Sequence, residues 1–253
     1  MLEVIRHDAT LEIRLARPPV NALDPGLVGA LHEAVVKAPA SGARALVISG
    51  NPGLFSAGLD VPVLLGLDRT AMVAFWKAFN ALLGAVGRCP LPTVAAITGH
   101  SPAGGAVLSL YCDYRVMARG PYRIGLNEVQ VGLSVPASIQ ATLRRLIGAH
   151  RAERLMVAGA MLDSDSALRV GLVDELVDVD HVVARALDWC RQHLALPQEA
   201  MAETRRIARA DLHDLLDAAQ RTPVDAFIER WFSEETQTTL TALVAKLKAK
   251  SAN

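Results

Sequence analysis

The chain lacks an excess of charge of either sign, and it has few aromatic side chains. Lys and Arg together number 26, as do Asp and Glu, and aromatic residues make up 4% of the 253 positions. Nucleic-acid binding usually needs a basic surface, often with rings on which bases stack, and a charged lipid surface attracts a field of one sign. We therefore expect neither a nucleic-acid partner nor a membrane partner.

Cysteines are also scarce, and long hydrophobic runs are missing. The three cysteines, at 89, 112 and 190, have no paired or ligand-like spacing, which argues against a disulfide framework or zinc site and favours a reducing compartment. No run approaches the roughly 18 consecutive apolar residues that span a bilayer. Residues 1–19 alternate like a strand and do not resemble a signal peptide. We expect a cytoplasmic protein with no metal ligands.

Several short catalytic and nucleotide-binding motifs do not occur. The sequence contains no G-x-x-x-x-G-K-[ST] and no G-x-G-x-x-G after a strand, so sites for a nucleoside triphosphate or a dinucleotide are not supported. It also contains neither the G-x-S-x-G of acyl-serine enzymes nor the H-E-x-x-H of zinc hydrolases.

The sequence does contain alternating strand and helix patterns. Half of the residues are apolar, enough for a sizeable core. Residues 2–17 predict a β-hairpin with its turn near His7 and Asp8, and a helix follows with Asp24 as its N-cap and Pro25 at its first position. Later segments alternate strand and helix with short glycine-containing joints, which predicts an α/β domain: strands at 43–50, 91–99 and 114–119, and helices at about 69–86 and 104–113.

The character of the sequence changes after about Ala137. Helical patterns dominate from there, residues 171–177 form a short strand pattern, and nearly everything after Asp180 is helical. We predict an α/β core over residues 1–190. A C-terminal helical region over residues 191–253 would then pack on that core or on neighbouring subunits.

Two glycine-rich joints could supply backbone hydrogen-bond donors. Small residues in 55–60, "FSAGLD", let the backbone bend closely and leave main-chain N–H groups available. In 99–110, "GHSPAGGAVLSL", Gly104 and Gly105 open a helix, whose first N–H groups lack internal partners. Each joint alone is better explained as a tight turn, because glycine-rich turns are common.

A single carboxylate in apolar surroundings completes the pattern. Glu128 lies in 123–136, "RIGLNEVQVGLSVP", and on its own it would be interpreted as a solvated loop residue or a helix cap. Combined with two sets of backbone donors, it suits a general base beside an oxyanion hole. Burial would raise its pKa toward the working pH.

Five segments in this order resemble the crotonase (enoyl-CoA hydratase/isomerase) superfamily. The likeness covers about residues 1–235, and "PAGG" with "GLNE" is most similar to the mitochondrial-type Δ3,Δ2-enoyl-CoA isomerases. The segments that carry it are "RPPVNAL" (17–23), "LFSAGLD" (54–60), "GHSPAGGAVLSLYCDYRVMA" (99–118), "IGLNEVQVGLSVP" (124–136) and "AERLMVAGAMLDSDSALRVGLVDELV" (152–177).

The resemblance implies a fold, an assembly and roles for individual residues. It implies a ββα spiral core with a C-terminal helical trimerisation region, in a homotrimer or a dimer of trimers. The backbone N–H groups of Leu59 and Gly104 would bind the thioester oxygen of an acyl-CoA substrate, and Glu128 would be the acid/base, with no separate cofactor. The residues expected to contact substrate are Ala22, Leu23, Ser56, Ala57, Gly58, Asp60, Gly105, Val107 and Asn127.

One position bears on the reaction. Hydratases of the family carry a second glutamate where this chain has Val107, and moving a double bond from C3 to C2 needs only one base. We therefore favour Δ3 to Δ2 enoyl-CoA isomerisation in fatty acid β-oxidation. A hydratase or another crotonase-type reaction is the alternative, with Asp60, Asp68 or Glu153 as a second acid. A non-enzymatic or RNA-binding protein of this fold is the third possibility.

Overall fold

A computed structural model describes residues 1–251, with side chains described to residue 249. The larger of its two sheets has six strands in the order β1-β2-β3-β5-β7-β10. The predicted hairpin forms the antiparallel β1–β2 pair, and the remaining pairs are parallel. The strands are β1 Leu2–His7, β2 Thr10–Leu15, β3 Ala45–Ser49, β5 Thr93–Ile97, β7 Tyr114–Ala118 and β10 Glu175–Val177.

A second, smaller sheet lies beside the first, in the order β4-β6-β8-β9. Its strands are two to four residues long, too short for an alternation pattern to reveal, and the sequence did not predict them. The pairs β4–β6 and β6–β8 are parallel. The strands are β4 Gly53–Leu54, β6 Gly99–Pro102, β8 Arg123–Gly125 and β9 Leu162–Asp163.

The chain makes three similar turns through both sheets, each turn a ββα unit. In every turn a strand of the large sheet leads into a strand of the small sheet and then into helical structure, which is the spiral core that the resemblance implied. After β4 come α2 (Val61–Leu64) and α3 (Arg69–Arg88); after β6 comes α4 (Gly104–Leu110); after β8 come the 3₁₀-helix η2 (Glu128–Val131) and α5 (Ala137–Ile147).

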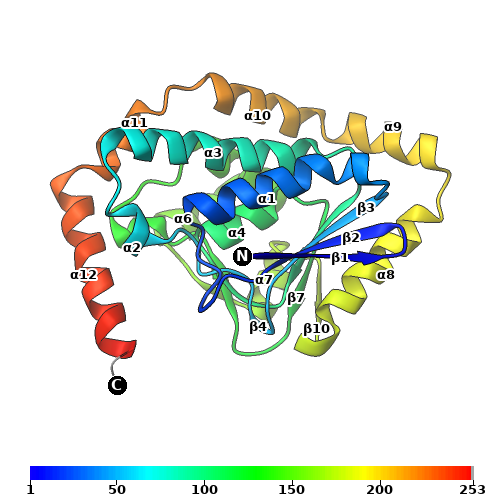
Figure 1. Cartoon of the computed structure of the whole chain (residues 1–253), viewed down its shortest axis with the longest axis horizontal. Helices are drawn as coiled ribbons and strands as arrows, with labels where there is room; N and C mark the ends of the chain where they lie inside the picture. The colour runs from blue at the N-terminus through cyan, green and yellow to red at the C-terminus, as the bar shows by residue number, and fades with distance from the viewer. Residues whose placement is uncertain (252–253) are drawn as a thin grey trace.

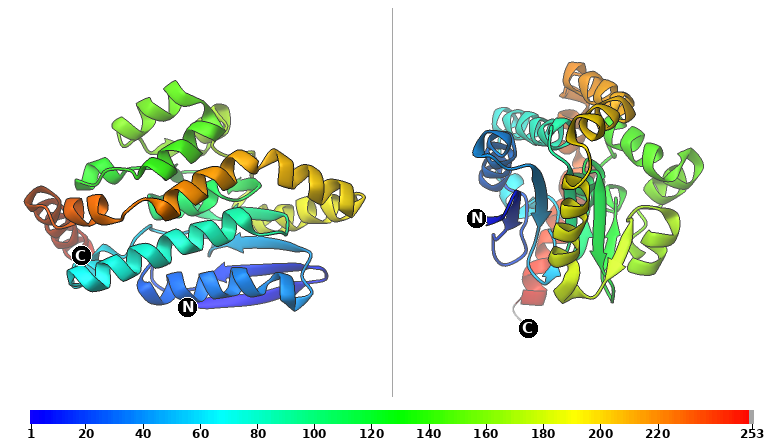
Figure 2. Two further views of the ribbon diagram at one scale, coloured as in Figure 1. Left: turned by 90° about the horizontal axis from the view of Figure 1, so that it is seen from above. Right: turned by 90° about the vertical axis from the view of Figure 1, so that its right-hand side faces the viewer.

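The large sheet is covered on both faces. Alternate residues along β3 point to opposite sides, so Ala45 and Val47 pack in a cluster with α8 (Val182–Leu194), whereas Leu46 and Ile48 belong to the main core. The main core also takes in α1 (Pro25–Lys37) and α3. Figure 2 shows α8 lying along its face of the sheet. Burial on both faces explains why these strands are apolar throughout.

Helix α3 is long and apolar. Among the described residues it is the one helix long and apolar enough to cross a membrane by length and composition. It packs against α1 and α10, with Met72, Phe75, Phe79 and Leu82 buried in the core. Its packing in the core accounts for its composition.

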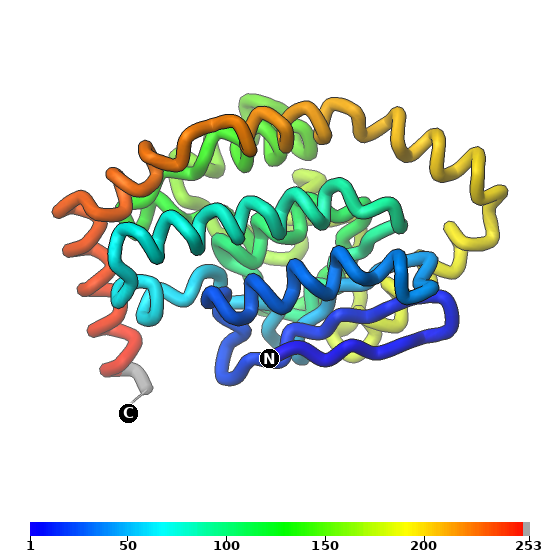
Figure 3. Tube along the Cα trace, turned by 45° about the horizontal axis from the view of Figure 1, so that its top comes forward, coloured from blue at the N-terminus to red at the C-terminus, as the bar shows by residue number. Residues whose placement is uncertain are grey.

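The C-terminal helices wrap around one side of the core. In Figures 1 and 3, α9 and α10 run above α3, and α12 turns down after α11, at the left of Figure 1. Helix α12 also contacts α2. Largely buried ion pairs attach α9 and α10, since Asp113 accepts from Arg205 at 2.9 Å and from Arg209 at 2.6 Å. The helices are α9 Gln198–Ala208, α10 Ala210–Arg221, α11 Asp225–Trp231 and α12 Glu234–Ser251.

The remaining elements are short connectors around the core. Helices α6 and α7 flank β9, and two 3₁₀ turns follow α1 and β10. Their bounds are α6 Ala149–Val157, α7 Ser164–Val170, η1 Pro39–Ser41 and η3 Val179–His181. The expected division at residue 190 lies within α8, and that division and the subunit contacts of the C-terminal helices stay predictions.

Candidate functional site

The small sheet brings the three candidate segments together. Strands β4, β6 and β8 are parallel neighbours, and each ends where a segment begins: 55–60 after β4, 103–105 after β6 and 126–128 after β8. Because the carboxyl ends of parallel strands meet at one edge, residues far apart in sequence emerge side by side. The Ala103 N–H donates to the Gly125 carbonyl at 2.8 Å, joining the second segment to the third.

The first backbone donor is the N–H of Leu59. Leu23 forms an isolated parallel bridge with Leu59, in which the Leu23 N–H donates to Gly58 and the Leu23 carbonyl accepts from Asp60. In such a bridge the middle residue, Leu59, turns its own N–H to the opposite side. That N–H donates to no other described residue, and its nitrogen lies 3.3 Å from where a Cβ on Gly104 would be.

The second backbone donor is the N–H of Gly104. It also donates to no other described residue, because it is in the first turn of α4. Ala103, the N-cap of α4, has φ 43° and ψ −118°, a region that residues with a Cβ rarely adopt. Since ψ of Ala103 sets the plane of the following peptide, this strained conformation fixes the direction of the Gly104 N–H.

Glycines at both joints permit the close approach. A Cβ on Gly58, whose φ is +84°, would lie 3.0 Å from the Pro102 carbonyl oxygen. A Cβ on Gly105 would lie 2.8 Å from the Ser56 carbonyl oxygen. Ser56 is fully buried, and its hydroxyl donates to Asn21 at 2.7 Å and accepts from Gly58 at 3.2 Å. Its side chain therefore holds the loop, and its expected contact with substrate stays a prediction.

An arginine not predicted from the sequence organises the first segment. Arg17 pairs with Asp24 at 3.0 Å and with Asp60 at 2.8 Å, and it donates to the Ala22 carbonyl at 3.1 Å. Asp60 also caps α2 by accepting from Val63. The expected Asp24 cap is present as well, accepting from Leu27 at 2.7 Å. The contact between residues 17–24 and Asp60 gave no local sequence signal, because the residues that form it are distant in the chain.

Glu128 is the carboxylate at the start of η2. It lies three residues beyond Gly125, hence within about 10 Å of it along the chain. Its side chain is half-buried, and its Oε2 atom is buried without a hydrogen-bond partner among the described residues. Burial raises the pKa of Glu128 to about 7, opposed only by a hydrogen bond to its own backbone. The adjacent Asn127 likewise has a buried, unpartnered Oδ1.

The other acids considered as a second acid are engaged or exposed. Val107 lies in α4 at the position where we noted that hydratases carry a second glutamate. It is 1% exposed in the apolar core. Asp60 is paired with Arg17, and Asp68 caps α3 by accepting from Ala71 at 2.8 Å. Glu153 is exposed on α6. Of these acidic side chains, Glu153 alone lines a cavity described below.

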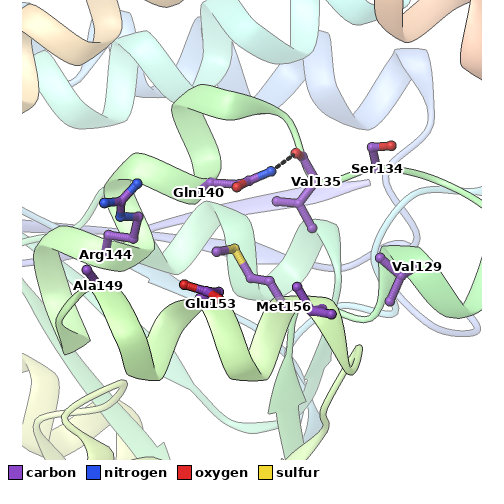
Figure 4. Close-up of a pocket in the computed structure, with 9 residues that line it drawn as sticks. Val129, Ser134, Val135, Gln140, Arg144, Ala149, Glu153 and Met156 are labelled. Carbon is purple, nitrogen blue, oxygen red and sulfur yellow. Dashed lines mark hydrogen bonds between the residues drawn. The ribbon is translucent and has the colours of Figure 1, made fainter.

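A cavity of about 320 Å³ opens beside η2 (Figure 4). In Figure 4, Gln140 points at the Val135 carbonyl, to which it donates at 2.7 Å, and Glu153 projects from α6. Val129, the residue after Glu128, lies on its wall. The lining residues are Val129, Ser134, Val135, Gln140, Arg144, Ala149, Glu153, Met156 and Val157.

The geometry defines what the site can do chemically. Two N–H groups from separate segments, neither of which donates to another described residue, can together bind an oxyanion. A carboxyl group with a pKa near 7 can accept and return a proton at neutral pH. No group of three or more His, Cys, Asp or Glu side chains within residues 1–251 is placed to hold a metal ion.

Comparisons with known proteins agree on one family. The family model described as enoyl-CoA hydratase/isomerase matches residues 6–252. Human mitochondrial enoyl-CoA delta isomerase 1 is 33% identical over 93% of this chain and 79% of its own length. A probable enoyl-CoA hydratase of Mycobacterium avium is also 33% identical, over 87% of this chain and 88% of its own.

Solved structures agree with the sequence relatives. The crystal structure of human mitochondrial delta3-delta2-enoyl-CoA isomerase has a TM-score of 0.92 at 31% identity, covering 98% of both chains. The expected fold class is thereby confirmed. The chain belongs to the enoyl-CoA hydratase/isomerase family.

Proposed function

We propose that the protein is an enoyl-CoA isomerase that moves a double bond from C3 to C2 of an acyl-CoA thioester. The observation that carries the proposal is the carboxyl of Glu128, whose buried Oε2 has no hydrogen-bond partner among the described residues, together with the apolar Val107 where hydratases carry a second glutamate. The human relative and its solved counterpart, both named as isomerases, support it. The substrate is then an acyl-CoA, with no separate cofactor.

In the proposed reaction one carboxylate carries the proton. Glu128 removes a proton from C2, and the electron pair moves through the thioester to give a dienolate whose negative oxygen accepts from the N–H groups of Leu59 and Gly104. The same carboxyl, now protonated, returns the proton to C4, and the double bond settles between C2 and C3. A pKa near 7 suits Glu128 to both transfers.

Hydration is the second candidate, because the mycobacterial relative is named as a probable hydratase at equal identity. Adding water requires one group to activate water and another to deliver a proton. Among the acids considered, Asp60 and Asp68 are already engaged, which leaves Glu153 beside η2.

A two-substrate assay separates the candidates. Wild-type protein is incubated with a 3-enoyl-CoA and, separately, with a 2-enoyl-CoA, and loss of each is followed spectrophotometrically. The isomerase proposal predicts conversion of the 3-enoyl thioester with negligible hydration of the 2-enoyl thioester. Rapid hydration that falls in Glu153→Gln would favour the hydratase instead. The homotrimer and the cytoplasmic location stay predictions; the human relative is named mitochondrial.

A further inference from the structure

The C-terminal helices contact the short helix that carries Glu128. Gly132, the residue that ends η2, has a carbonyl oxygen that accepts from Arg230 Nε at 3.0 Å and from Thr236 Oγ1 at 2.7 Å. Arg230 is in α11 and Thr236 is in α12, about a hundred residues away in sequence. Two side chains from different helices thus meet on one carbonyl.

The contact is close, and Thr236 is buried in it. Thr236 is fully buried, and a Cβ on Gly132 would lie 3.2 Å from the Thr236 Cα, closer than an ordinary van der Waals contact. Gly132 has φ +75°, a conformation that glycine adopts without strain. The Arg230 guanidinium is held in turn by Glu235 at 2.8 Å.

Hydrogen bonds carry this contact back to Glu128. A backbone hydrogen bond links the two ends of this segment, because the Leu133 N–H donates to the Glu128 carbonyl at 3.0 Å. On its other side η2 is tied to the end of α6, where Gln130 Nε2 donates to the Gly159 carbonyl at 2.8 Å. The 3₁₀-helix that holds Glu128 is therefore tied down at Gln130 and at Gly132, and Gly132 is the point that the C-terminal helices hold.

We propose that Arg230 and Thr236 are positioning residues, which hold η2 so that the Glu128 carboxyl stays in its buried site. The inference rests on the proposed function, in which Glu128 is the base. The C-terminal helices would then affect proton transfer through the position of Glu128. Charged groups near η2 are Arg144 on α5, Glu153 on α6, and Arg230 and Glu235 on α11–α12. None of them contributes to the raised pKa of Glu128, which burial causes.

The test compares hydroxyl removal with hydroxyl retention. In Thr236→Val the Gly132 carbonyl loses one donor, and in Arg230→Met it loses the other; Thr236→Ser keeps the hydroxyl. We expect each loss to lower kcat about 10- to 100-fold with little change in KM, since about 1 Å of misplacement costs this much. We also expect the acid limb of the kcat–pH profile to move to lower pH, because a loosened Glu128 is better solvated. Thr236→Ser should keep both kcat and the kcat–pH profile as in wild type.

Two matched controls remove equivalent groups elsewhere. Thr239, one turn along α12, donates only to the Glu235 carbonyl of its own helix, so Thr239→Val should behave as wild type. Arg69 pairs with Glu229 and lies over the Phe232 ring, so Arg69→Met loosens α11 without touching Gly132. Equal effects in the controls, or an unmoved kcat and pH profile in Thr236→Val and Arg230→Met, would overturn the inference.

A substrate-free measurement keeps the inference separate from the proposed function. The ionisation of Glu128 is followed by infrared difference spectra of wild type against Glu128→Gln over a pH titration, and repeated in the Thr236→Val background. A midpoint that falls in Thr236→Val supports the positioning role even if no enoyl-CoA is turned over. An unchanged midpoint contradicts it even if isomerase activity is present.

Discussion

Replacing Glu128 with glutamine should stabilise the protein above neutral pH. The pKa of this carboxyl is raised from its usual 4.5 to about 7 because burial disfavours the charged form. Between these two values the folded state keeps a proton that the unfolded state has lost, so stability falls as pH rises through this window. Below about 4.5 the proton is bound in both states, and above about 7 the loss is complete.

The pKa shift sets the size of the effect. A move of this size corresponds to at most about 3 kcal/mol, and because the side chain is only half-buried we expect about 1–2 kcal/mol. Urea unfolding of wild type and Glu128→Gln, from pH 4 to 9, measures it. The two curves should coincide near pH 4 and separate between pH 4.5 and 7. The exposed Glu153→Gln serves as control, and a difference independent of pH would refute the reasoning.

Three substitutions test the packing around the site and the attachment of the C-terminal region. Gly105→Ala should lower stability by about 1–3 kcal/mol, together with activity, because its Cβ would lie 2.8 Å from the Ser56 carbonyl oxygen. Gly29→Ala, in α1 with nothing near the new Cβ, should instead stabilise by about 0.5–1 kcal/mol. Asp113→Asn leaves the buried Arg209 without its charged partner, and urea unfolding should show a loss of about 3–5 kcal/mol.

Features with local causes could be predicted from the sequence. The Asp24 cap lies next to the helix it begins, and the hairpin of β1 and β2 alternates on either side of its turn. Gly104 opens α4 as the glycine pair indicated. Each depends on residues within a few positions of one another, where propensity and spacing carry the information.

Other features depend on contacts between distant residues or run against local preference. The small sheet has strands too short to show a period, yet it is what aligns the three segments. Arg17 reaches Asp60 across about forty residues, and Thr236 reaches Gly132 across about a hundred. Ala103 adopts a positive φ that its own side chain disfavours, so local propensity would not predict this conformation. Tertiary packing decides all of these.

The central claim is that Glu128 alone carries the proton in isomerisation. The most direct measurement is the rate of 3-enoyl-CoA isomerisation by wild type and Glu128→Gln at pH 8, where the wild-type carboxyl is ionised. Loss of general-base catalysis should cost about 10²- to 10⁴-fold in kcat, in a variant that is folded and at least as stable as wild type. Isomerisation by Glu128→Gln at the wild-type rate would contradict the claim.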